Sequence, residues 1–129
     1  MICVDTNIIV RFLTHDDKRQ YKKAFSIFNS QQIFIPDTVI LETEWVLRYA
    51  YNFSSTEICT AFIGLFGLKN THLSNPTFIF QAIEWHKKGL DFSDAMHLTQ
   101  CQQYEKLYTF DKTFSQKAKD LTACLVSLP

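Results

Sequence analysis

Acidic side chains stand where the sequence predicts that a buried strand ends or a helix begins. Asp5 follows the apolar run that opens the chain, and Asp111 follows the apolar stretch 107–110. Asp91 and Asp94 lie three residues apart at the start of another predicted helix. In open α/β sheets, the turns that follow parallel strands meet at one edge, and ligands bind there. We therefore expect several of these carboxylates to share one site.

Each of these acids also has a simpler structural explanation, because an Asp at a helix start caps free N–H groups and meets the positive end of the helix dipole. Asp91 and Asp94, however, repel one another unless a positive group lies between them. Ligand sets made only of oxygen select hard cations, so Mg²⁺ is the predicted metal and Mn²⁺ the alternative. Such a metal keeps open positions, which suit phosphate oxygens and the activation of a water for attack.

The helix predicted from Asp37 to about Phe53 carries two further candidates, Glu42 and Glu44. Glu44 has Arg48 four residues later, the favoured orientation of a helical ion pair, so we expect Glu44 to be a solvated surface charge. Both glutamates flank the same apolar stripe, and periodicity does not choose between them. The lack of a partner for Glu42 favours Glu42 as the site residue.

The remaining sequence alternates between strands and helices. Such alternation predicts one α/β domain over residues 1–129, with a parallel sheet and helices on both faces. The predicted strands are 1–4, 32–35, 71–73, 107–110 and 123–128. The first three predicted helices are 6–14, a second helix capped by Asp16 or Asp17, and 37–53. A fourth helix begins with a capping box at 54–57 and ends near Lys69, and a fifth runs from Asn75-Pro76 to Gly89. A sixth begins within 91–94, and a short seventh begins at Asp111.

Composition narrows the class of protein. No apolar run reaches the roughly 18 residues of a membrane span, and no signal peptide is evident, so we expect a cytoplasmic protein. The four cysteines show neither metal-ligand nor disulfide spacing, and we expect buried thiols. Bases and acids number 13 each. Without the five candidate acids, the rest of the chain has eight acids against 13 bases. An acidic site surrounded by a surface with net positive charge suits a phosphodiester substrate.

Four motifs, "VDTNIIVRFL", "LETEWVL", "GLDFSDAMHL" and "YTFDKTF", occur in an order that resembles PIN-domain ribonucleases, specifically the VapC-type toxins of bacterial toxin–antitoxin pairs. The resemblance covers nearly the whole chain. It implies a three-layer α/β/α PIN-like fold with a central, mainly parallel sheet. It further implies a Mg²⁺-dependent endoribonuclease whose metal-binding and catalytic acids are Asp5, Glu42, Asp94 and Asp111.

The resemblance also implies supporting residues and partners. Thr6, Asn7 and Thr109 match positions that orient the ligands, which fits the general need to hold metal-binding carboxylates in place. Asp91 is a ligand, an orienting residue or only a cap. We expect His97 to be a hydrogen-bonded core residue rather than a ligand. The implied partners are an RNA substrate, a small antitoxin protein and a second copy of the chain in a homodimer.

Acids at these positions also occur in other classes of protein. A haloacid-dehalogenase-type phosphatase needs a second Asp two residues after the first, but that position is Asn7. The serious alternative is a catalytically inactive PIN-like module that binds RNA or protein. Such modules usually lose one or more ligands, so the complete set of acids favours the enzyme.

Overall fold

The computed structural model describes residues 1–129. Contacts between residues divide the chain into two compact units, 1–76 and 77–129. The first unit contains β1 (Ile2–Cys3), α1 (Thr6–Thr14), α2 (Lys18–Ser30), β2 (Ile33–Ile35), α3 (Asp37–Ala50), α4 (Ser55–Phe66) and β3 (Thr71–Leu73). The second contains α5 (Pro76–Lys87, whose first residue closes the first unit), α6 (Phe92–Cys101), β4 (Lys106–Tyr108), α7 (Lys112–Lys117) and β5 (Leu125–Ser127).

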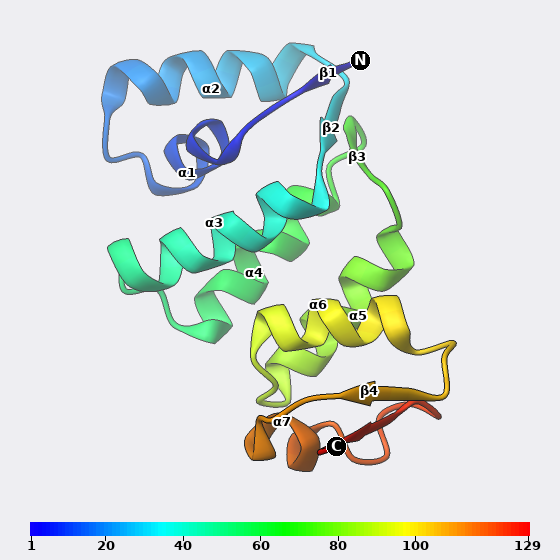
Figure 1. Cartoon of the computed structure of the whole chain (residues 1–129). Helices are drawn as coiled ribbons and strands as arrows, with labels where there is room; N and C mark the ends of the chain where they lie inside the picture. The colour runs from blue at the N-terminus through cyan, green and yellow to red at the C-terminus, as the bar shows by residue number, and fades with distance from the viewer. The chain divides into compact units, whose positions relative to one another are not determined.

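A three-stranded parallel sheet forms the centre of the first unit. Its order is β1-β2-β3, and Ile33 of the middle strand pairs with Ile2 on one side and Thr71 on the other. Ile33 and Ile35 have no exposed surface, which agrees with a strand that is buried between neighbours. Helix α1 packs against α2 and α3, while α4 packs against β3 (Figure 1).

The second unit is built around a two-stranded parallel sheet. Leu107 of β4 pairs with Val126 of β5. Helix α6 contacts β4, and α7 contacts β5. Every strand pair in the chain is parallel, so the predicted α/β class with a parallel sheet is confirmed. That residues 1–129 form a single PIN-like domain stays a prediction.

Most helix boundaries follow the predicted signals. Asp17, rather than Asp16, caps α2, and the capping box of α4 joins Ser54 and Glu57 in both directions. Helix α3 ends at Ala50, three residues before the predicted Phe53. The reason lies in the backbone: Asn52 adopts a left-handed conformation with φ of 55°, which does not continue a helix.

Helix α4 also ends early, at Phe66 instead of near Lys69, because the chain turns at Gly67. Gly89 has φ of 107° and ends the turn after α5 as predicted. The expectation of four buried thiols is wrong in part, since Cys3 is exposed and Cys101 half-buried. None of the helices combines the length and the apolar character that crossing a membrane requires.

Candidate functional site

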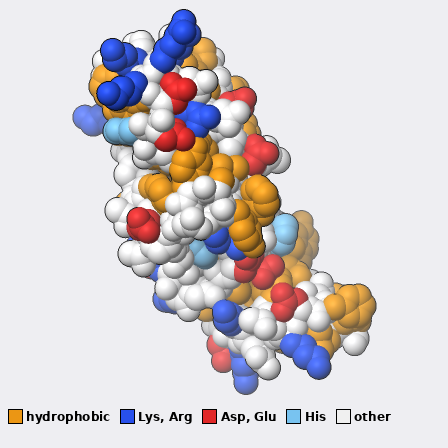
Figure 2. Space-filling model, turned by 90° about the vertical axis from the view of Figure 1, so that its left-hand side faces the viewer, with side chains coloured by type: hydrophobic (Ala, Val, Ile, Leu, Met, Phe, Trp, Pro, Cys, Tyr) orange, Lys and Arg blue, Asp and Glu red, His pale blue; other side chains and the backbone are white.

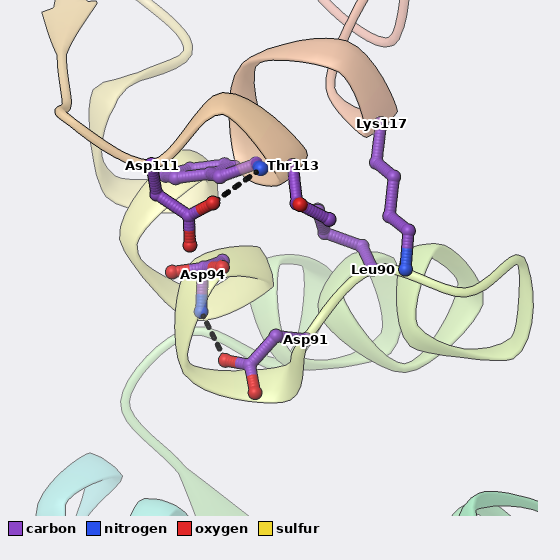
Figure 3. A pocket seen from close by; sticks show the side chains of 7 residues that line it. Leu90, Asp91, Asp94, Asp111, Thr113 and Lys117 are labelled. Atoms are coloured by element: carbon purple, nitrogen blue, oxygen red, sulfur yellow. Dashed lines mark hydrogen bonds between the residues drawn. The ribbon is translucent and has the colours of Figure 1, made fainter.

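Two carboxylates face one another in a pocket of about 300 Å³ in the second unit (Figure 3). They belong to Asp94, in the first turn of α6, and Asp111, at the start of α7. We call this cavity the acidic pocket. It is lined by Leu90, Asp91, Asp94, Asp111, Thr113, Phe114 and Lys117.

Helix caps hold the acids of this pocket in place. Oδ1 of Asp91 accepts hydrogen bonds from the Asp94 backbone N–H at 3.1 Å and from Ser93 Oγ at 2.7 Å. Oδ1 of Asp111 accepts from the Phe114 N–H at 3.1 Å. These are the N-cap contacts that the sequence suggests as the simpler explanation. Capping and a functional role are compatible, because the cap contact of Asp111 uses one oxygen of its carboxylate and does not use the other.

Thr109 lies two residues before Asp111 and supports its backbone through a hydrogen bond. Its Oγ1 accepts a hydrogen bond from the Asp111 backbone N–H at 3.0 Å. This contact fixes the backbone from which the Asp111 carboxylate projects. The predicted orienting role of Thr109 remains a prediction, but the contact it would need is present.

The surroundings of Asp94 make its carboxyl group harder to ionise. Partial burial raises the pKa of Asp94 above its ordinary value, and the negative charges of Asp91 and Asp111 raise it further, while His97 acts in the opposite direction. Ionising Asp94 at neutral pH therefore costs folding free energy unless a positive charge compensates. A divalent cation between the carboxylates would supply that charge.

Lys117 is a residue of the pocket that sequence reasoning missed. It lies near the end of α7, and its Nζ donates a hydrogen bond to the Gly89 carbonyl at 2.9 Å. The residue that it contacts lies 28 positions earlier, so no local pattern could have placed it. Thr113, which also lines the pocket, was missed because a Thr in the first turn of a helix carries no distinguishing signal.

The other two predicted ligands lie in the first unit. Asp5 caps α1 through a long contact of 3.4 Å from the Ile8 N–H to Oδ1. The next residue, Thr6, is 5% exposed, and its Oγ1 donates to Glu42 Oε1 on α3. Thr6 therefore connects the start of α1 with Glu42. Asn7, the third residue of this motif, is exposed.

The expectation that Glu44 is a solvated surface charge is wrong. Glu44 is 2% exposed and Glu42 is exposed, although both lie on α3. The predicted partner is correct: Arg48 donates from Nε to Oε2 at 2.7 Å and from Nη2 to Oε1 at 3.1 Å. This paired geometry compensates the burial of the charge, which periodicity alone could not reveal. Glu44 is therefore already neutralised, and Glu42 remains the predicted ligand.

The expectation of a core position for His97 is also wrong, because His97 is exposed. It lines a second hollow of about 390 Å³ that shares Asp94 and Phe114 with the acidic pocket. The apolar neighbours in the sequence are buried on the other side of α6, including Ala95 and Leu98.

Neither unit alone contains three or more acidic, histidine or cysteine side chains close enough to hold a metal ion. Asp94 and Asp111 lie in the second unit with Asp91 beside them, whereas Asp5 and Glu42 lie in the first.

Parallel strands with acids at their ends, and a pocket lined by carboxylates, define an α/β protein with an acidic pocket. The PIN-domain sequence profile matches residues 2–120, and the chain belongs to the PIN-domain family. Among solved structures, it is similar to the crystal structure of Mycobacterium tuberculosis VapC20, described as a sarcin-ricin loop cleaving toxin. That match has 20% identity and a TM-score of 0.46, and covers 90% of this chain and 94% of the other. No curated protein matches the sequence.

The raised pKa of Asp94 predicts a pH-dependent stability difference. A carboxyl group whose pKa is raised by folding contributes stability below its unfolded value, near 3.9, and that contribution is lost as pH rises through the folded value. In EDTA, Asp94→Asn should therefore melt at a higher temperature than wild type at pH 7, and the difference should shrink towards about pH 3.5. Asp120→Asn, an exposed acid outside the acidic pocket, should give a difference that does not vary with pH. Thermal melts across pH test this; a pH-independent effect of Asp94→Asn would contradict it.

The burial of Glu44 predicts a structural role. Glu44→Gln should lower the free energy of unfolding by about 1–3 kcal/mol, because it removes a charge that receives two hydrogen bonds from Arg48. The matched control is Glu84→Gln, which breaks an exposed pair with Lys87 and should cost no more than about 1 kcal/mol. Urea unfolding of both variants measures the contrast. Equal effects would mean that the Glu44 pair is as weak as a surface pair.

Proposed function

We propose that the chain is a Mg²⁺-dependent endoribonuclease and the toxin of a toxin–antitoxin pair. The observation that carries the proposal is the pair of facing carboxylates, Asp94 and Asp111, in a pocket where their mutual repulsion calls for a cation. Membership of the PIN-domain family supports the same chemistry. The four sequence motifs that resemble VapC-type toxins support the assignment to that group.

The donor set fits Mg²⁺, since every candidate ligand is a carboxylate oxygen. Asp5, Glu42, Asp94 and Asp111 would hold the ion, with Mn²⁺ as a substitute. When bound, the ion would offset the negative charge of the phosphodiester and make a water more acidic for attack on phosphorus. The protein's own contribution is to position the acids.

Each of the positioning contacts has a definite task in this proposal. Thr6 donates to Glu42 and so directs that carboxylate, while Thr109 holds the backbone of Asp111. Asp91 acts as the cap that orients the first turn of α6, in which Asp94 lies. Lys117 adds a positive charge at the edge of the acidic pocket, where it would attract the phosphates of a substrate.

A partner protein is also part of the proposal. Trp45 and Tyr49, one turn apart on α3, are 55% and 60% exposed, and their ring centroids lie 5.2 Å apart. Exposed aromatic side chains of this size are typical of protein interfaces. A small antitoxin or a second copy of the chain in a homodimer would cover them.

Purified protein should cleave single-stranded RNA with Mg²⁺ or Mn²⁺ and lose this activity in EDTA. Attack by water with the 3′ oxygen leaving gives 5′-phosphate and 3′-hydroxyl ends, which end-labelling of the products identifies. Asp94→Asn should abolish cleavage. Activity that persists in EDTA, or products with 2′,3′-cyclic phosphates, would contradict the proposal. RNA binding without cleavage in either metal would instead favour the inactive PIN-like module.

The assignment of Glu42 is tested against Glu44. Glu42→Gln keeps the shape of the side chain but removes its charge, so it should reduce cleavage at low Mg²⁺ by about 10- to 100-fold, with partial recovery at saturating Mn²⁺. Its melting temperature should change little. Glu44→Gln should lose stability but retain cleavage per folded molecule. If Glu44→Gln is the inactive variant that metal rescues, the ligand on α3 is assigned incorrectly.

A further inference from the structure

Four basic residues are concentrated in the first half of α2. Lys18, Arg19, Lys22 and Lys23 lie within six positions, and all four are exposed. They border a shallow hollow of about 410 Å³. Figure 2 shows Lys and Arg side chains gathered over this end of the first unit, with a histidine beside them. We call these four residues the basic face of α2.

The basic face has no acidic partner. None of the four side chains makes an ion pair or a hydrogen bond. The nearest acids in the sequence are engaged elsewhere: Asp17 caps α2 by accepting from the Gln20 N–H at 2.9 Å, and Asp16 accepts from Arg11 and Tyr51. The positive charge of the basic face is therefore uncompensated within the unit.

The arrangement is unfavourable for the helix itself. Lys18 and Lys22 are four residues apart, as are Arg19 and Lys23, and like charges at this spacing repel. All four lie in the first half of α2, and Lys18 and Arg19 lie in its first turn, where the helix dipole is positive. Helix stability therefore does not explain the basic face, whereas an anionic ligand would relieve both effects.

Aromatic rings border the same surface. Tyr21 and Phe25 lie one turn apart on α2, with ring centroids 6.0 Å apart, and Phe25 is 47% exposed. The ring of His15 lies 3.9 Å from that of Tyr21. At 100° per residue, the row of Tyr21 and Phe25 lies beside the row of Lys18 and Lys22. Basic residues next to aromatic rings are the combination that binds single-stranded nucleic acid, through phosphates and stacked bases respectively.

We propose that the basic face of α2 binds the phosphate backbone of single-stranded RNA, with Phe25 and Tyr21 offering stacking surfaces beside it. The inference deepens the proposed nuclease function, on which it rests, by naming where the substrate is held outside the acidic pocket. An acidic protein segment would satisfy the charge but would gain less from the aromatic row. The basic face should thus raise affinity for RNA without taking part in bond cleavage.

The experiment measures binding of a fluorescently labelled single-stranded RNA of mixed sequence in EDTA, where no metal-dependent cleavage occurs. The test variant replaces the whole basic face, K18Q/R19Q/K22Q/K23Q. The control variant removes the same number of positive charges from exposed lysines elsewhere, K69Q/K87Q/K88Q/K119Q. Fluorescence anisotropy over a series of KCl concentrations gives the affinity and its salt dependence.

Affinity of the test variant should fall about 10-fold or more at moderate salt, and the slope of log affinity against log salt should become shallower by about 3, because four phosphate contacts are lost. The control variant should change much less. In Mg²⁺, the test variant should raise KM for RNA and keep kcat. Its melting temperature should equal or exceed that of wild type, since repulsion within α2 is removed.

Equal RNA affinity and salt slope for the two variants would overturn the proposal. Binding of a labelled glutamate-rich peptide that the test variant loses, with RNA binding unchanged, would overturn it in favour of an acidic protein segment. The nuclease proposal is judged separately: wild-type protein that binds RNA through the basic face but does not cut it in Mg²⁺ or Mn²⁺ supports this inference and contradicts the cleavage function.

Discussion

Electrostatic repulsion among the carboxylates of the acidic pocket is the constraint on which the rest of the site depends. Asp94 and Asp111 face one another, and Asp91 lies at the start of the same helix as Asp94. Partial burial of Asp94, together with the negative charges of Asp91 and Asp111, raises the pKa of Asp94, so ionising all three groups costs free energy. Part of this cost is offset because two of the acids also stabilise the helices that follow them. Asp91 and Asp111 cap the helices that follow them, so the same side chains stabilise α6 and α7.

The dual use of caps explains why the site can be built from short elements. A strand of only two or three residues cannot fix the direction of a carboxylate by itself. The helix that follows can, because the backbone N–H at its third position holds one oxygen of the capping Asp. Thr6 and Thr109 add one further contact each, to Glu42 and to the backbone of Asp111. The carboxylates are therefore directed by contacts that form within each unit.

The features that follow from local rules were predictable from the sequence. The limits of α1, the capping box at Ser54 and the caps at Asp91 and Asp111 depend on neighbours within four residues. The features that the sequence did not predict depend on burial and on contacts between residues that are distant in the sequence. The exposure of Glu42 and burial of Glu44 were not visible, because both flank the same apolar stripe. Lys117 was missed because its contact is with a backbone carbonyl in another turn of the chain.

A formal charge of zero conceals a strong separation of charge. In the second unit, three of the acids line one pocket, whereas in the first unit four bases share half of one helix. Neither the cluster of acids nor the cluster of bases is favourable for folding, because like charges repel one another in both. Helix α2 tolerates its basic face because Asp17 caps it and because Ala24 and Phe28 are buried on its opposite side, where Phe28 stacks on Phe12 at 4.3 Å. The buried side stabilises the helix, which leaves the exposed side able to carry charges that only a ligand would neutralise.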